Sequence, residues 1–393
     1  MRIGVDVTVL TRATGSGVER YAGEIVRQLI EIAPQHRFVL SYFAGPRDPA
    51  SALSGRGRDL DFRPIRALSV ERYRSLHLRS LAPPFDLLSR GRADVYLFPD
   101  FVRWPVLTRR SVVVVHDLAF AKVPQFVPAG TRALLDNVVP RSAAKADAIV
   151  AVSEFTKREL LTTFDLDPDR VAVVPNAVDH DRFSPRSPDE IEVVSGKLGI
   201  DRPYVLMTGT VEPRKNVVGL LRAFASMSDV HRTHALVLAG STGWLDEEIR
   251  ALAESMRRSG MAVIQPGHVD DTDLPALYSG AAVFVLPSWY EGFGVPVLEA
   301  MACGAPVVTT RNASLPEVAG EAALFAEGGD APAIAEALHR VLRDPVLRAD
   351  LRERGLVRAC GTSWTESARR MLACLEGVAG DRGKAAPGDR ALR

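Results

Sequence analysis

Short runs of apolar residues recur along the chain, and segments with helical periodicity lie between them. The run RIGVDVTVL is followed by a helix-like segment over 18–33, and later runs include SVVVVHD, AIVAVS, YVLMTG and VFVLPS. Continuous apolar runs of this length are typical of parallel strands that are buried on both faces of a sheet. Because strands and helices alternate throughout, the pattern predicts an α/β fold.

The pattern also predicts how the chain divides. A chain of 393 residues is long enough for two domains, each with its own core. The apolar pattern breaks over 176–202, where prolines and charges are dense, which predicts an interdomain linker. We therefore expect one α/β domain over 1–184 and a second over 185–360, then a helix over 361–377 with one apolar face. The Gly-, Pro- and charge-rich segment 378–393 predicts a disordered tail.

Composition narrows the class of protein. Hydrophobic residues make up 47% of the chain and the net charge is +1, which excludes a disordered chain and argues against a nucleic-acid binder. Three cysteines in a chain of this length form no disulfide framework and indicate a reducing compartment. No apolar run is long enough for a membrane span, and the first residues resemble a strand rather than a signal peptide. These features predict a cytoplasmic protein.

Unusual residues in the first half follow two of the apolar runs. Ligands of doubly wound sheets bind at the carboxyl ends of the strands, so these positions are candidates for chemistry. Gly15 and Gly17 precede a helix whose free amides could receive an anion, although a plain turn explains them equally well. His116 and Asp117 follow SVVVV and either face a ligand or, for the histidine, form a buried hydrogen bond in the core.

In the second half, a strand ends at Gly209 and its loop carries Arg214 and Lys215. Arginine suits bidentate contact with phosphate and lysine supplies a compact charge, so the pair matches a diphosphate without a metal ion. The alternative is a solvated surface pair. The sequence has no aspartate-rich metal motif, so we expect no metal site and no cofactor.

The strongest signal is the segment EGFGVPVLE. Glu291 opens a turn through Gly292, Phe293 and Gly294, and a helix begins near Pro296, so the turn presents backbone amides to an anion. Glu299 lies inside an otherwise apolar helix, where a carboxylate is costly to bury unless it is hydrogen-bonded, for example by ribose hydroxyls. The alternative is a partly exposed helix glutamate.

Taken together, these segments resemble the retaining glycosyltransferases of family 4. The resemblance runs from residue 1 to about residue 376 and rests on the ordered motifs GSGVERY, VVHDLAF, VSEFTKREL, VVPNAVD, TGTVEPRKN, GHVDDTDLPALYSGAAVFVLPS and EGFGVPVLEAMACG. It implies the GT-B architecture, in which two Rossmann-like domains with parallel sheets face an interdomain cleft and the final helix crosses back to the first domain. The second domain would bind a nucleotide-sugar donor, and the first would bind the acceptor.

The resemblance also implies roles for individual residues. Arg214 and Lys215, beside Gly209, would hold the diphosphate, and Glu299 the ribose. Glu291 would contact the donor sugar and phosphates. His116 would face the sugar being transferred and, with Glu291, Arg214 and Lys215, is a predicted catalytic residue. The other implied donor and acceptor contacts come from the turn amides of Gly292, Phe293, Gly294 and Val295, from the base-framing His268 and Val269, from Gly15 and Gly17 over the diphosphate, and from His116 and Asp117 at the acceptor side.

The implied reaction is the transfer of a hexose with retention of configuration. Cations and amides would stabilise the leaving diphosphate. No carboxylate is placed as a covalent nucleophile, which favours attack on the same face of the sugar. The motifs are most similar to GDP-mannose-dependent mannosyltransferases of polysaccharide and O-antigen assembly, with a saccharide or lipid-linked glycan as acceptor. UDP- or dTDP-sugar donors with a small-molecule acceptor remain an alternative, as do a nucleotide-sugar-modifying GT-B protein and a non-catalytic one.

One arginine-rich segment raises the question of a membrane partner. RPIRALSVERYRSLHLRSLAPP places arginines among leucines at positions 63, 66, 72, 74 and 79. Such a segment could dock peripherally on the anionic inner face of a membrane, and the alternative is a solvated face of an arginine-rich protein. The oligomeric state stays open.

Overall fold

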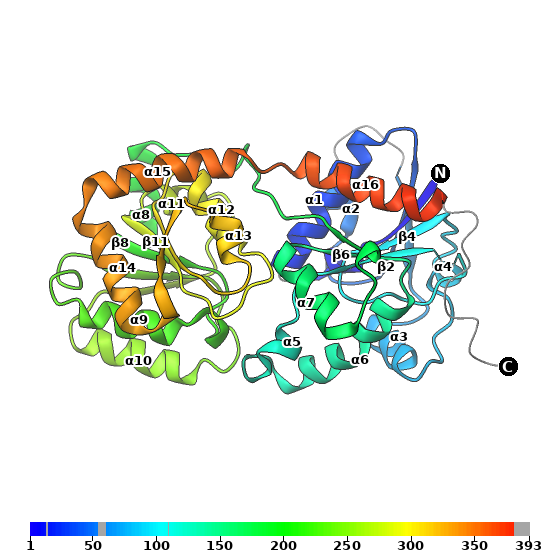
Figure 1. The fold of residues 1–393 in the computed structure, drawn as a ribbon, viewed down its shortest axis with the longest axis horizontal. Coiled ribbons are helices and arrows are strands. Elements are labelled where there is room, and N and C mark those ends of the chain that lie inside the picture. The colour runs from blue at the N-terminus through cyan, green and yellow to red at the C-terminus, as the bar shows by residue number, and fades with distance from the viewer. Residues whose placement is uncertain (13–14, 54–59, 109, 381–393) are drawn as a thin grey trace. The chain divides into compact units, whose positions relative to one another are not determined.

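The computed structural model describes residues 1–12, 15–53, 60–108 and 110–380 (Figure 1). The chain forms two compact units. The first contains Met1–Ala121, Ala129–Asn176 and the chain from Trp364 onward, and the second contains Lys122–Pro128 and Ala177–Ser363. Each unit is an α/β domain built on one parallel sheet, as the alternating pattern predicts.

The sheet of the first unit has seven strands in the order β3-β2-β1-β4-β5-β6-β7, and every pairing is parallel. The strands are β1 (Arg2–Asp6), β2 (Arg37–Phe43), β3 (Asp61–Ile65), β4 (Val95–Phe98), β5 (Ser111–Val115), β6 (Ala148–Ala151) and β7 (Val171–Val173). The central strands β4 and β5 are buried at every position, which explains their uninterrupted apolar runs.

Helices connect these strands. They are α1 (Gly17–Ile32), α2 (Pro49–Leu53), α3 (Val70–Leu78), α4 (Phe85–Leu88), α5 (Ala119–Lys122), α6 (Ala129–Lys145) and α7 (Glu154–Phe164), with short 3-10 turns η1 (Thr8–Thr11), η2 (Pro124–Phe126) and η3 (Pro168–Arg170). The Ser16 side chain caps α1 by accepting a hydrogen bond from the amide of Glu19. This cap sets the start of α1, the first α-helix after β1.

The last helix, α16 (Trp364–Gly380), packs against α1 in the first unit (Figure 1). The ring of Trp364 lies edge-on to that of Tyr21, with 5.9 Å between centroids, and Met371 and Leu375 are fully buried. The helix ends at Gly380, so 378–380 are helical rather than part of a tail, and the rest of the predicted tail lies outside the described residues.

The sheet of the second unit has six parallel strands in the order β10-β9-β8-β11-β12-β13. They are β8 (Tyr204–Thr208), β9 (Ala235–Ala239), β10 (Val263–Gly267), β11 (Val283–Leu286), β12 (Val307–Thr310) and β13 (Ala323–Ala326). The connecting elements are α8 (Pro188–Lys197), η4 (Pro213–Lys215), α9 (Val217–Ser226), α10 (Glu247–Arg258), α11 (Leu274–Ser279), α12 (Val295–Ala302), α13 (Leu315–Ala319), η5 (Glu327–Gly329), α14 (Ala331–Arg343) and α15 (Pro345–Cys360).

The segment predicted as a linker is largely structured. The Ser187 side chain and Glu190 form a capping box with Pro188 in the first turn, so a helix, α8, forms where the sequence analysis expected a linker. Phe183 is buried, and its ring lies 6.1 Å from that of Tyr278. The main part of the second unit runs from Ala177 to Ser363, whereas the sequence analysis placed the start of the second domain at residue 185. None of the helices within the described ranges is long and apolar enough to cross a membrane.

Candidate functional site

The loop after β8 brings Arg214 and Lys215 to the carboxyl edge of the second sheet. Gly209 follows the strand with a φ of +103°, a conformation that favours glycine. A Cβ atom at Gly209 would lie 3.2 Å from Cε of Lys215, so the glycine leaves room for the lysine side chain. The loop then forms the 3-10 turn η4, and Lys215 is buried within it.

Glu291 follows the neighbouring strand β11 and lies against both cations. Its Oε2 accepts a hydrogen bond from Nη1 of Arg214 (3.1 Å). Its Oε1 accepts from Nζ of Lys215 (3.0 Å) and from the Ser288 hydroxyl (2.8 Å). Burial by itself would raise the pKa of Glu291, but the charges of Lys215 and Arg214 and these hydrogen bonds outweigh it and lower the pKa to about 2. The glutamate is therefore ionised at neutral pH.

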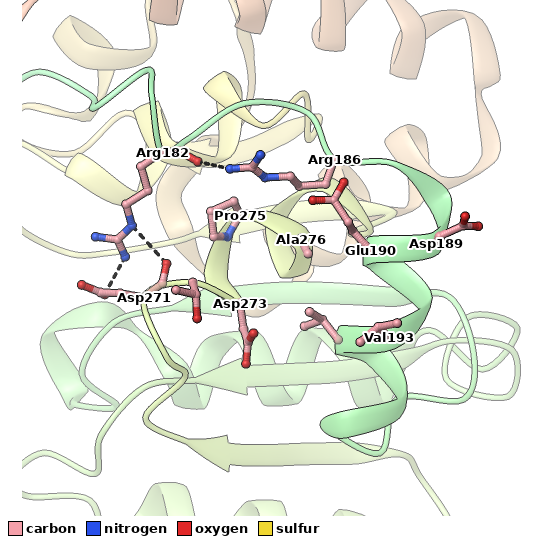
Figure 2. A pocket seen from close by; sticks show the side chains of 11 residues that line it. Arg182, Arg186, Asp189, Glu190, Val193, Asp271, Asp273, Pro275 and Ala276 are labelled. Atoms are coloured by element: carbon pink, nitrogen blue, oxygen red, sulfur yellow. Dashed lines mark hydrogen bonds and ion pairs between the residues drawn. The ribbon is translucent and has the colours of Figure 1, made fainter.

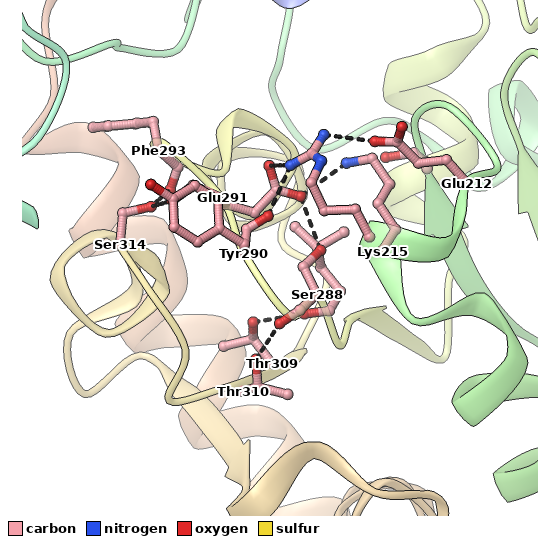
Figure 3. A network of polar contacts seen from close by, with 12 residues as sticks. Glu212, Lys215, Ser288, Tyr290, Glu291, Phe293, Thr309, Thr310 and Ser314 are labelled. Atoms are coloured by element: carbon pink, nitrogen blue, oxygen red, sulfur yellow. Dashed lines mark hydrogen bonds and ion pairs between the residues drawn. The ribbon is translucent and has the colours of Figure 1, made fainter. Parts of the chain in front are cut away.

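A second carboxylate, Glu212, completes this charge cluster, and the sequence analysis missed it (Figure 3). Its Oε1 accepts a hydrogen bond from Nη2 of Arg214 at 2.6 Å, and its side chain is 1% exposed. Burial raises the pKa of Glu212, and the charge of Glu291 raises it further, while Arg214 and Lys215 oppose the shift. A glutamate two positions before the arginine in a strand-end loop was the available signal.

Two hydroxyl side chains stabilise the turn between Glu291 and α12: Thr310 at the end of β12 and Ser314 directly before α13. Gly294 precedes α12 with a φ of +101°, and no side chain caps the start of the helix. The Ser314 hydroxyl donates to the carbonyls of Glu291 (2.9 Å) and Phe293 (2.8 Å), and Thr310 donates to that of Ser288 (2.9 Å) (Figure 3). Ser314 and Thr310 therefore hold the turn in shape, and neither was singled out from the sequence.

Glu299 belongs to the same sequence segment as Glu291, but its hydrogen bond is to a tyrosine rather than to the two cations. It is 2% exposed within α12, so the alternative of a partly exposed helix glutamate was wrong. Its Oε2 accepts a hydrogen bond from the Tyr278 hydroxyl at 2.9 Å. Near the end of β10, His268 is exposed and Val269 is buried, after Gly267 with its positive φ.

His116 and Asp117, the predicted residues that follow β5, form a separate group that contains no cation. His116 follows β5, is buried, and donates from Nε2 to the carbonyl of Pro99 at 2.8 Å. Its ring lies edge-on to Tyr21, at 5.1 Å, and 5.3 Å from Phe101. Burial lowers the pKa of His116, so the ring is neutral at pH 7. Asp117 accepts a hydrogen bond from the amide of Ala119 at 2.9 Å and so caps the turn after the strand.

The two glycines before α1 lie in open surroundings. Gly15 precedes the Ser16 cap and Gly17 is the first residue of the helix. Among the described residues outside the immediate chain neighbours, a Cβ atom at either position would meet no atom within 4 Å.

A cavity of about 700 Å³ also lies in the second unit, between α8 and the segment that leads into α11 (Figure 2). Arg182 pairs with Asp271 there, and Arg186 donates to the carbonyl of Arg182. Two arginines face four carboxylates in the lining, so the cavity does not suit a diphosphate. None of the predicted donor-binding residues lines it.

Comparison with known proteins agrees with this geometry. Residues 190–358 match the family "Glycosyl transferases group 1", and residues 15–182 match "Glycosyltransferase Family 4". The chain is 35% identical over 359 residues to the O-antigen chain mannosyltransferase B of Escherichia coli, which covers 89% of this chain and 93% of the relative. It is 33% identical to a D-inositol 3-phosphate glycosyltransferase of Salinispora arenicola, over 58% of this chain and 54% of the relative.

The fold is shared with solved structures, among them the glycosyltransferase WaaG, with a TM-score of 0.73 at 17% identity over 96% of this chain and 100% of that chain. The structure of Anabaena HepE in complex with UDP-glucose superposes with a TM-score of 0.72, at 15% identity, over 96% of this chain and 100% of that chain. Two parallel-sheet Rossmann-like domains of seven and six strands, together with this likeness, confirm the predicted GT-B fold. The chain therefore belongs to glycosyltransferase family 4 and is a hexosyltransferase.

Proposed function

We propose that this enzyme transfers mannose from GDP-mannose to a saccharide or lipid-linked glycan, with retention of configuration and without a metal ion. One observation carries the proposal: Arg214 and Lys215 are fixed beside Glu291 at the strand-end site of the second unit. The choice of mannose is supported by the 35% identity to a mannosyltransferase that spans nearly the whole chain.

The cation pair would stabilise the leaving diphosphate. When the bond to the sugar breaks, negative charge develops on the leaving oxygen, and preorganised cations at that point are the largest available source of stabilisation. Arg214 and Lys215 are held in place by Glu212 and Glu291 before any donor binds, so little reorganisation is needed. Gly209 and the amides of Gly292, Phe293, Gly294 and Val295 would complete the phosphate and sugar contacts.

Retention would proceed by attack on the same face of the sugar. A covalent mechanism needs a carboxylate that is free to attack the anomeric carbon. Both oxygens of Glu291 instead accept hydrogen bonds, from Arg214, Lys215 and Ser288. This supports a role for Glu291 in orienting the reacting carbon, with the departing phosphate accepting the proton of the acceptor hydroxyl.

The remaining residues would bind the rest of the two substrates. We assign Glu299 to the ribose hydroxyls and the backbone at His268 and Val269 to the base. From the first unit, the neutral His116 would face the transferred sugar with Asp117 at the acceptor side, and Gly15 and Gly17 would approach the diphosphate. Nδ1 of His116 is the ring atom suited to accept from a sugar hydroxyl, since Nε2 carries the proton that bonds Pro99.

Metal independence follows from the same cation argument. Two cations can neutralise a diphosphate directly, so we expect full activity in the presence of a chelator. Loss of activity in chelator that magnesium or manganese restores would overturn this part of the proposal.

A UDP- or dTDP-sugar donor is the second candidate. It is favoured by the fold shared with HepE, whose structure holds UDP-glucose. The acceptor in that case would be a small molecule. The side chain of His268 is exposed and that of Val269 is buried, so the contact we assign to this segment is made by its backbone. A backbone contact is compatible with either base.

We also propose a peripheral membrane contact through the arginine-rich segment. Arg66, Arg72 and Arg79 are exposed around α3, and Leu81 is 67% exposed beside them. Arg63 is paired with Asp61 and does not belong to this docking set. Exposed cations next to an exposed leucine suit an anionic lipid surface that carries a lipid-linked acceptor.

A thermal-shift panel tests the donor assignment. We expect GDP-mannose to raise the melting temperature more than UDP-glucose or a dTDP-sugar at equal concentration, since a ligand at 100 times its Kd stabilises by about 2.7 kcal/mol. Lys215→Ala should abolish the shift, whereas Arg222→Ala, at an exposed ion pair on α9, should not. A larger shift with a UDP- or dTDP-sugar would favour the second candidate.

A further inference from the structure

A chain of hydrogen-bonded hydroxyls reaches Glu299 from the end of β8. The hydroxyls of Thr208 and Tyr278 are 2.7 Å apart, and that of Tyr278 donates to Oε2 of Glu299 at 2.9 Å. Because tyrosine has a single hydroxyl proton, Thr208 must be the donor in the first of these bonds. The three side chains are between 0 and 4% exposed, so water does not compete for these bonds.

The three residues of this hydroxyl chain come from three different elements. Thr208 ends β8, Tyr278 lies on α11 and Glu299 lies on α12. Thr208 also directly precedes Gly209, the residue that leaves room for Lys215. The hydroxyl chain therefore ties the glutamate of one strand-end segment to the loop that carries the two cations.

Tyr278 is protonated at neutral pH and can therefore donate its hydroxyl proton. Burial raises its pKa well above the ordinary value, and the charge of Glu299 raises it further. A protonated hydroxyl that donates to one carboxylate oxygen fixes the rotation of the carboxylate. A carboxylate that is already oriented loses less freedom when a ligand binds to it.

We propose that Tyr278 is a positioning residue for nucleotide recognition, which presets the Glu299 carboxylate for the ribose hydroxyls and is itself held by Thr208. The inference rests on the proposed function, in which Glu299 accepts hydrogen bonds from the ribose. Without the Tyr278 hydroxyl, the carboxylate loses a hydrogen bond that orients it before the ribose binds. The nucleotide then binds more weakly, and the contribution of each ribose hydroxyl falls.

A purely structural role for Tyr278 predicts a different result, and the chain offers a matched control. Tyr204 is also buried, and its hydroxyl donates at 2.7 Å to the carbonyl of Leu277, the residue before Tyr278. Tyr204→Phe removes a buried hydroxyl from the same region without touching Glu299. Both substitutions should therefore lower the melting temperature to a similar extent, while only one should change ribose recognition.

The test measures binding of GDP, 2′-deoxy-GDP and 3′-deoxy-GDP to the full chain by calorimetry, with UDP and its deoxy forms in parallel. In the wild type, loss of a ribose hydroxyl should weaken binding at least tenfold, as expected for a hydrogen bond to a charged group. Tyr278→Phe should weaken binding of the intact nucleotide by about tenfold and reduce the deoxy penalty to about threefold. Tyr204→Phe should keep the wild-type penalty.

A second variant protects the test against a failure of Tyr278→Phe to fold. Thr208→Val removes the donor that holds the Tyr278 hydroxyl, and it should reduce the deoxy penalty in the same direction by a smaller factor. Equal deoxy penalties in the wild type, Tyr278→Phe and Thr208→Val would overturn the inference and leave the proposed function intact.

The proposed function can fail separately in the same experiment. If the wild type binds a nucleotide but does not distinguish it from its deoxy forms, Glu299 does not bind the ribose, and the assignment of Glu299 falls together with the inference. If the wild type binds neither GDP nor UDP, the donor proposal itself is overturned.

Discussion

The carboxyl edges of the two sheets carry different chemistry. After β5 in the first unit, the only predicted catalytic residue is a neutral histidine, which donates to a carbonyl and lies against Tyr21 and Phe101. After β8 and β11 in the second unit, Lys215, Glu212 and Glu291 are buried, and the half-buried Arg214 pairs with both carboxylates. A buried ionisable side chain must either be neutral or have a partner of opposite charge. His116 in the first unit is neutral, whereas the charged side chains of the second unit are paired.

This difference indicates which substrate part each unit can recognise. An anionic diphosphate needs cations that are already held in place, and within the described residues the second unit has such a pair at its sheet edge. A sugar hydroxyl needs only a neutral donor or acceptor, which His116 supplies. Variants that remove the charges of the second unit, or the neutral ring of His116 in the first, test this division of roles.

Removing a cation should have the largest effect. Arg214→Ala and Lys215→Ala should each lower turnover at saturating donor by about 10²–10³, as expected for loss of a group that stabilises the leaving diphosphate. The measurement is the initial rate of sugar transfer, with Arg222→Ala as the control, since its partner Glu248 is also exposed. Wild-type turnover in either variant would remove the assignment of the diphosphate to this cluster.

Removing the charge of Glu291 should destabilise the protein and slow the reaction. Breaking a buried ion pair from one side costs about 3 kcal/mol, so Glu291→Gln should lower the free energy of unfolding by that amount at pH 7. The pKa of Glu291 is lowered from 4.5 to about 2 on folding, so the wild-type advantage is present above pH 4.5 and is lost as the pH falls through about 2. Glu291→Ala should also reduce the maximal rate at saturating donor, because the orientation of the reacting carbon is lost.

Inorganic diphosphate provides the control for this prediction. Arg214 and Lys215 lose an anionic partner in Glu291→Gln, so diphosphate should stabilise the variant more than it stabilises the wild type. Chemical denaturation at pH 7 and pH 3, with and without diphosphate, measures both effects. A stability difference that is the same at both pH values would contradict the role of the ionised carboxylate.

The sequence was sufficient for the parts of this comparison that depend on local pattern. Strands buried on both faces require uninterrupted apolar runs, so β5 and β11 and the residues that follow them could be predicted. Arg214 and Glu291 stand 77 positions apart, and both could be assigned to one site because the carboxyl ends of parallel strands share one edge. Their ion pair was not predicted. The direction of each side chain in that edge was not predictable.

What the sequence could not reveal are contacts that depend on packing between distant elements. The carboxylate of Glu212 turns toward Arg214 rather than to solvent because the loop folds back on itself, and Ser314 reaches the Glu291 turn from a different loop. The tyrosine in LPALYS was not singled out from the sequence. Its bond to Glu299 depends on the packing of α11 beside α12. Helix α8 was missed for a different reason, since its capping box was present in the sequence and was overlooked.

Replacing the neutral ring of His116 should have a moderate effect on rate alone. We expect His116→Asn to lower the maximal rate about tenfold, the low end for loss of a positioned polar group, and to leave the donor Kd unchanged. Burial lowers the pKa of His116 from its ordinary value of 6.5, so any loss of the wild-type rate on protonation of this ring should be centred below pH 6.5. The control is His231→Asn, because His231 lies in the turn that follows α9 and is not assigned to the site. A weaker donor Kd in His116→Asn would contradict the division of roles between the two units.

The smallest effect should come from the charges on the outside of the first unit. If these cations serve a membrane surface, replacing Arg66, Arg72 and Arg79 by alanine one at a time should weaken binding to anionic vesicles by about fivefold each, since a basic residue near such a surface contributes about 1 kcal/mol. Transfer to a water-soluble acceptor should stay unchanged, because none of the three contacts the groups of the sheet edge described above. Arg63→Ala is the matched control, since Arg63 is already paired with Asp61 and should contribute little to vesicle binding.

Vesicle binding should also fall as salt screens the lipid charge. Equal binding to neutral and anionic vesicles, or an equal loss in Arg63→Ala, would show that these arginines form an ordinary solvated face and that the charges of the first unit have no part in substrate recognition.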